Sequence, residues 1–67
     1  MKFRGALVTT AQLMQMLERE TGKSPFMMSV HNKNEVGRWL NGQEPRVDNL
    51  NDVLLANGYE LVVMRKG

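Results

Sequence analysis

Two helix-start signals in one short stretch constrain this chain more than any other feature. Ser24 precedes Pro25. A Ser hydroxyl can cap free backbone N–H groups, and proline suits the first helical position because its missing N–H is not needed there. Asn32 stands three residues before Glu35, which is the spacing of a capping box with Asn in place of the usual Ser or Thr. The stretch therefore predicts a short helix, a polar turn and a second helix over residues 32–41.

The second predicted helix has two unlike faces. Val36, Trp39 and Leu40 share one face by the i, i+3, i+4 spacing, and we expect that face to pack in the core. Gly42 then supplies a left-handed stop. The opposite face carries two cations, two amides and a glycine, and no carboxylate: Lys33, Asn34, Gly37, Arg38 and Asn41. Lys, Arg and Asn side chains match the edges of guanine and adenine in the major groove, although a solvated helix face shows the same pattern.

The composition limits the class of protein. The 67 residues make one small domain, residues 1–67, whose core is marginal enough for a partner or a dimer to help. The absence of cysteine excludes disulfides and thiolate zinc ligands and fits a cytoplasmic location. The longest apolar runs, 26–28 and 61–64, are too short to cross a membrane, and no signal peptide is visible. The net charge of +2 permits nucleic-acid binding without requiring it.

The pattern does not predict an enzyme. His31 is the only histidine, and no paired carboxylates converge, so we expect no catalytic residue, no metal and no cofactor. His31 falls in the predicted turn, where it could cap a helix or contact a phosphate. Met27 and Met28 are expected in the core rather than as ligands. Three acidic residues read as surface and capping charges: Glu44, Asp48 and Asp52.

Two further helices flank the central stretch. Thr9 and Gln12 have the spacing of a capping box, and Gly22 is the residue expected just past a helix end, so residues 9–22 are predicted to form the first helix. Its buried stripe is Leu13, Met14 and Leu17. The last helix is predicted over residues 46–58. Its apolar positions recur at helical spacing: Val47, Leu50, Val53 and Leu54.

The two ends of the chain predict short strands. Tyr59, Leu61 and Val63 share one side of segment 59–64, whose residues favour strands, and residues 1–8 read as a short strand or an ordered arm. A lone strand cannot satisfy its own backbone groups, so we expect these strands to pair with each other or across the two-fold axis of a homodimer. The predicted fold class is therefore mainly α, with four short helices, a helix-turn-helix and terminal strands.

In this order and spacing, the elements resemble the phage-repressor and Cro-like helix-turn-helix family, which includes many antitoxin-type regulators. The resemblance covers about residues 24–63 and rests on three features: VGRWLNG over 36–42 followed by Pro45, the apolar spacing of the last helix, and GYELVV over 58–63. Arg46 departs from the family pattern, because it stands where a capping Ser or Thr is expected.

The resemblance places base-reading side chains on the exposed side of the second helix: Asn32, Lys33, Asn34 and Arg38. We expect phosphate contacts from residues around the helix-turn-helix and from a basic N-terminal arm: Lys23, Ser24, Asn41, Gln43, Arg46, Lys2 and Arg4. The implied function is sequence-specific binding of double-stranded DNA by a homodimer that regulates transcription from a palindromic operator. The alternative is an inhibitor or adaptor that uses the helix-turn-helix scaffold to bind another protein.

Overall fold

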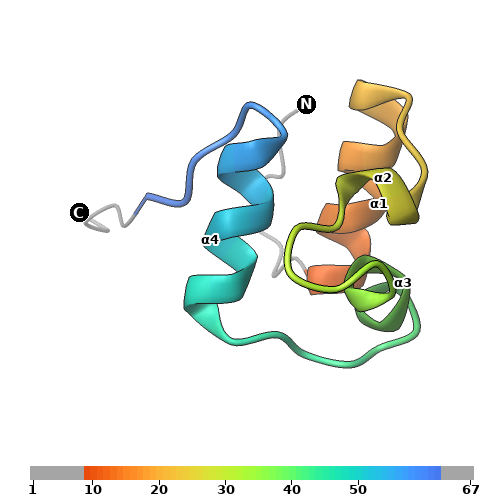
Figure 1. Ribbon diagram of the computed structural model, residues 1–67, viewed down its shortest axis with the longest axis vertical. Helices are drawn as coiled ribbons and strands as arrows, with labels where there is room; N and C mark the ends of the chain where they lie inside the picture. Colours follow the sequence, from red (N-terminus) through yellow and green to blue (C-terminus); the bar gives the residue numbers. More distant parts are fainter. Residues whose placement is uncertain (1–8, 63–67) are drawn as a thin grey trace.

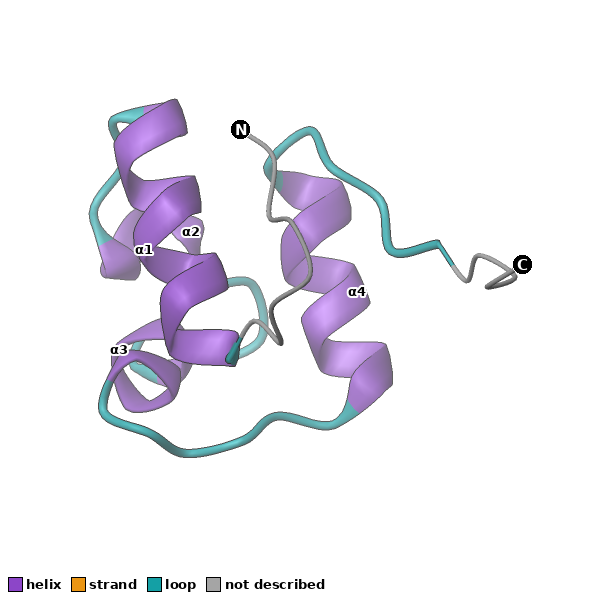
Figure 2. Cartoon of the chain, turned by 180° about the vertical axis from the view of Figure 1, so that it is seen from behind, coloured by secondary structure: helices purple, strands orange, loops and turns teal. Residues whose placement is uncertain are grey.

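The computed structural model describes residues 9–62, which form four helices and no strand (Figure 1). The helices are α1 (Thr10–Thr21), α2 (Pro25–Met28), α3 (Glu35–Leu40) and α4 (Val47–Ala56). The first three gather on one side of the molecule, and α4 stands alongside them at the end of a connecting loop (Figure 2). The mainly helical fold class is therefore confirmed.

Local sequence signals place both ends of α1. The Thr9 side chain accepts from the backbone N–H of Gln12 at 3.1 Å, and the Gln12 side chain accepts from the N–H of Thr9 at 3.0 Å. This reciprocal pair is the predicted capping box. At the other end Gly22 adopts a left-handed conformation, with φ of 68°, and its N–H bonds the carbonyl of Glu18. Both signals are confirmed because each depends on residues within one helical turn.

The start of α2 is also confirmed, whereas the capping box predicted at Asn32 is wrong. The Ser24 hydroxyl accepts from the N–H of Met27, as a cap does. Asn32, however, uses its side-chain oxygen to accept from the N–H of Asn34 at 2.8 Å, which is an Asx turn. The Glu35 carboxylate turns away from Asn32, and α3 begins only at Glu35.

The core draws residues from all four helices. Its buried members are Met14, Leu17, Met28, Val36, Trp39, Val53 and Leu54. Leu13, Leu40 and Leu50 pack against this cluster and are partly buried, so the predicted apolar faces of α1 and α3 are confirmed. Burial of these side chains is the main source of stability in a domain of this size.

Two residues expected to be apolar contacts face solvent instead. Met27 is 65% exposed, and Val47 at the start of α4 is also exposed. Because α2 is a single turn, it can direct only one side chain, Met28, into the core. Val47 lies in the first turn of α4, two turns before the buried Val53 and Leu54.

Polar contacts between distant segments hold α4 and its loop in place. The side-chain amide of Asn57 donates to the carbonyls of Met28 and Val53, at 3.1 and 2.7 Å. The Thr10 hydroxyl donates to the Glu44 carboxylate at 2.8 Å. These bonds show that Glu44, predicted to be a simple surface charge, connects the loop before α4 to the start of α1.

The strands predicted at the two ends fall largely outside the described residues. Residues 1–8 lie outside them, as do Val63 and the residues that follow. Residues 59–62 follow α4 as irregular chain; the N–H of Tyr59 donates to the carbonyl of Leu54 at 2.8 Å. The pairing of terminal strands therefore stays a prediction. None of the helices between residues 9 and 62 combines the length and the apolar character that crossing a bilayer requires.

Candidate nucleic-acid interface

One face of α3 and the turn before it forms an open groove against the start of α2. The groove has a volume of about 320 Å³. Its lining is Pro25, Phe26, Lys33, Asn34, Gly37, Arg38 and Asn41. All five residues of the polar face predicted from the sequence line it, so the structure brings them together on one surface.

The polar side chains of this groove are available to a ligand. Lys33, Asn34, Arg38 and Asn41 are exposed. Within the described part of the chain, none of these four side chains takes part in an ion pair or a hydrogen bond. No carboxylate among the described residues lines the groove, so its charge is positive. The donors and acceptors of these four side chains are unused. A surface of this kind suits an anionic ligand with many polar groups.

The opposite face of α3 fixes the groove in place. Val36 is fully buried, and Trp39 is 5% exposed. Ser29 joins the two helices, because its hydroxyl donates to the carbonyl of Pro25 at 2.8 Å and accepts from the N–H of Val36 at 3.2 Å. The polar face is therefore presented by a helix whose position is set by packing and by hydrogen bonds, as a preformed binding surface requires.

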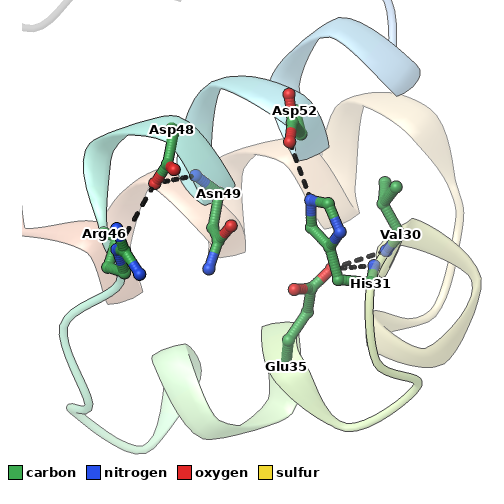
Figure 3. Close-up of polar contacts among 7 residues, drawn as sticks. All are labelled: Val30, His31, Glu35, Arg46, Asp48, Asn49 and Asp52. Carbon is green, nitrogen blue, oxygen red and sulfur yellow. Dashed lines mark hydrogen bonds and ion pairs between the residues drawn. The ribbon is translucent and has the colours of Figure 1, made fainter.

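The turn between α2 and α3 is closed by Glu35, which is only 7% exposed. One oxygen of its carboxylate accepts from the backbone N–H groups of Val30 and His31, at 2.6 and 3.0 Å (Figure 3). Hydrogen bonds to an ionised group are stronger than neutral ones. The bonds fix the direction in which the chain enters α3.

A second hollow of about 310 Å³ lies between this turn and the loop before α4. It contains the predicted phosphate contacts Gln43 and Arg46, and Arg38 lines it as well as the first groove. Two carboxylates, Glu35 and Glu44, also line it. Because these negative charges oppose an anion, the second hollow suits contacts at its rim more than insertion of a nucleic acid.

The remaining predicted contacts lie in several places. Asn32 lines the second hollow, with its side-chain oxygen already accepting from Asn34. Lys23 and Ser24 precede α2 and line neither hollow; the Lys23 ammonium donates to the Asn57 side chain at 3.4 Å. Two further residues, Lys2 and Arg4, lie outside the described residues.

Sequence reasoning missed two features of this region. Phe26 lines the groove, and its side chain is 63% exposed. Its exposure follows from the one-turn length of α2, which directs a single side chain into the core. His31 pairs with Asp52 of α4 at 2.7 Å (Figure 3). Asp52, predicted as a surface or capping charge, is thus a hydrogen-bond partner of the turn, and no local signal in the sequence joins these two residues.

The described residues hold no group of three or more His, Asp or Glu side chains placed to bind a metal. Comparisons with protein-family models, with curated proteins and with solved structures find no match for this chain. Function is therefore inferred from the groove beside α3 and from the sequence resemblance described above.

Proposed function

We propose that this chain is a sequence-specific double-stranded DNA-binding regulator of transcription, a repressor or autoregulator, that places α3 in the major groove. The observation that carries the proposal is that α3, together with the turn before it, has one buried face and one exposed polar face. Trp39 and Val36 are buried in the core, while Lys33 and Arg38 stand in an open groove without an acidic partner among the described residues. The resemblance to Cro-like regulators supports the same conclusion.

Base recognition is assigned to the residues at the start of α3 and one turn along it. The guanidinium of Arg38 can pair with O6 and N7 of guanine, and the Asn34 carboxamide can pair with N6 and N7 of adenine. Lys33 supplies a further donor to the same groove. Asn32 contributes its side-chain NH₂ group, because its oxygen is used within the turn.

Phosphate contacts are assigned to residues at the edges of this surface. Asn41 ends the groove, and Gln43 and Arg46 follow in the loop before α4. Arg46 is exposed and makes a long contact of 3.7 Å with Asp48 (Figure 3). An exposed pair of this kind costs little to open, so Arg46 can exchange its partner for a phosphate. Such contacts set the register of the protein on the duplex.

A homodimer completes the proposal. Two copies related by a two-fold axis would present their α3 helices about 34 Å apart, which matches two half-sites of a palindrome. The chain after α4 turns back beside that helix (Figure 1), where the N–H of Leu61 donates to the Asn51 side chain at 3.4 Å. Its exposed apolar side chains Tyr59, Leu61 and Val62 would provide a surface for the second copy.

Selection of bound duplexes from a random pool tests the function directly. We expect a palindromic consensus, because a symmetric dimer reads the same half-site twice. Recovery of unrelated sequences after repeated rounds would contradict sequence-specific binding.

Replacement of Arg38 by alanine tests the role of α3. We expect Arg38→Ala to weaken binding to the selected duplex by about 1–3 kcal/mol and to relax specificity at one position of each half-site. The measurement is a gel-shift titration of all single-base variants. Arg19→Ala is the matched control, because Arg19 is an exposed arginine in the last turn of α1 that lines neither hollow. Equal losses for both variants would show that only net charge matters.

A protein-binding inhibitor or adaptor is the second candidate, and one observation favours it. Phe26, Met27 and Val30 are exposed apolar side chains close together in the chain. The two functions respond differently to salt. The logarithm of the DNA-binding constant falls linearly with the logarithm of the salt concentration, with a slope of about −0.9 for each phosphate contact. The affinity of an apolar protein interface is nearly insensitive to salt.

A further inference from the structure

Phe26 is an aromatic side chain that the core does not use. It is 63% exposed, whereas Met28, two residues later on the same helix, is 1% exposed. Successive helical residues are rotated by about 100°, so these two side chains point in nearly opposite directions. The side of α2 from which Phe26 projects is set by its backbone, because the Ser24 cap and the Ser29 hydroxyl hold both ends of this helix.

The position of Phe26 distinguishes it from an ordinary exposed apolar residue. Single apolar side chains on a surface are common and need no explanation. Phe26, however, lines the same groove as Lys33, Arg38 and Asn41. Together with Pro25 it gives this polar and cationic surface one apolar wall, contributed by α2.

Gly37 also lines this groove and adds no side chain to it. A β-carbon added at Gly37 would meet no atom within 4 Å. The groove is therefore open at Gly37, and a ligand group can approach this part of α3 without displacing part of the protein.

The major groove of DNA displays one apolar group, the 5-methyl of thymine, and Phe is among the side chains that contact it. A ligand that offers base edges to Arg38 therefore also offers methyl groups to a neighbouring apolar wall. We propose that Phe26 is a specificity-determining residue that selects thymine by contact with its 5-methyl group. The proposal rests on the proposed function and names a base feature that the polar residues of α3 cannot read.

Removal of the methyl group alone tests this contact. In the selected duplex each thymine is replaced in turn by deoxyuridine, and affinities are measured by gel shift for the wild type and for Phe26→Ala. We expect one thymine per half-site at which deoxyuridine weakens the wild type about fourfold, the value for one buried methyl group. Phe26→Ala should bind the thymine duplex more weakly and should not distinguish the two bases there.

Met27→Ala is the matched control, because Met27 is 65% exposed on the same helix turn but does not line the groove. It should keep the fourfold difference. Thermal melting of both variants checks that the fold is intact, as expected for exposed positions. If no thymine shows the difference, or if Phe26→Ala retains it, the inference is overturned while the DNA-binding function stands. A wild type that selects no duplex would overturn the proposed function and the thymine contact together.

Discussion

At the residue scale, the Glu35 side chain closes the turn between α2 and α3. Its carboxylate is buried and is the acceptor for two consecutive backbone N–H groups of the turn. These two bonds are partly buried, and a hydrogen bond to a charged group contributes about 1.5–3 kcal/mol. These bonds join the turn to the start of α3, in addition to the packing of Val36 and Trp39 and the hydrogen bonds of Ser29.

We therefore expect Glu35→Ala to lower the free energy of unfolding by about 2–4 kcal/mol, since it leaves both N–H groups without a protein acceptor. Glu35→Gln should cost less, because the amide oxygen can still accept although the charge is lost. Urea denaturation followed by circular dichroism measures both. Glu20→Ala, at an exposed position of α1, should change stability by less than about 0.5 kcal/mol. Equal stability of Glu35→Ala and wild type would refute the closing role of the carboxylate.

The limits of sequence reasoning also show at this scale. The box at Thr9 and the cap at Ser24 were predictable, because a cap joins atoms three residues apart. Asn32 and Glu35 have the same spacing, yet Glu35 bonds the turn on the far side of Asn32. The local pattern is compatible with both arrangements. The observed arrangement is the one in which Glu35 is buried next to the buried Val36. Which of the two hydrogen-bond arrangements forms depends on the tertiary structure, which a local pattern does not contain.

At the element scale, α3 contains a residue that weakens it. Gly37 stands inside this helix, where glycine is about 1 kcal/mol less favourable than alanine. Its backbone does not require glycine, because positive φ angles occur only at Gly22, Gly42 and Gly58 among the described residues. The structure also leaves room for a β-carbon. Neither packing nor backbone conformation therefore requires glycine at this position, which lines the groove beside α3.

Gly37→Ala should consequently separate stability from binding. We expect the free energy of unfolding to rise by about 0.5–1 kcal/mol, from helix propensity, while affinity for the selected duplex falls because the new methyl group occupies the groove. Denaturation and gel shift provide the two values. Gln15→Ala, on the exposed side of α1, should add a few tenths of a kcal/mol without affecting binding. A variant that is more stable and binds as well as the wild type would remove Gly37 from the interface.

The prediction of elements succeeded where periodicity was long and failed where an element was short. The first helix extends over three turns, so Met14 and Leu17 identified its buried side. For α2, four residues cannot establish a period. Met27 was predicted to lie in the core, although Met28 is the only residue of α2 that is buried.

Of the polar face predicted for residues 32–41, only Gly37 and Arg38 lie in α3; Lys33 and Asn34 lie in the turn before it and Asn41 follows it, although all five line one groove. The apolar wall at Phe26 was missed because the short length of α2 was not predicted.

At the scale of the whole molecule, the chain has more apolar surface than its small core can cover. Leu55, Tyr59, Leu61 and Val62 are all exposed at the end of α4 and in the segment that follows. Small domains bury a limited fraction of their surface, and association covers more of it. A second copy bound at this end would leave the α3 groove free, since none of these four residues lines it.

Leu61→Ser tests this arrangement. We expect the wild type to sediment as a dimer of 7.7 kDa chains at micromolar concentration and the variant to shift toward monomer, because the substitution removes an apolar contact from each side of a symmetric interface. Affinity for the palindromic duplex should fall with it, while affinity for a duplex with a single half-site should not. Val47→Ser is the control, since Val47 is exposed at the opposite end of α4. If the wild type is monomeric in free solution and still prefers the palindrome, two copies associate only when they are bound to DNA.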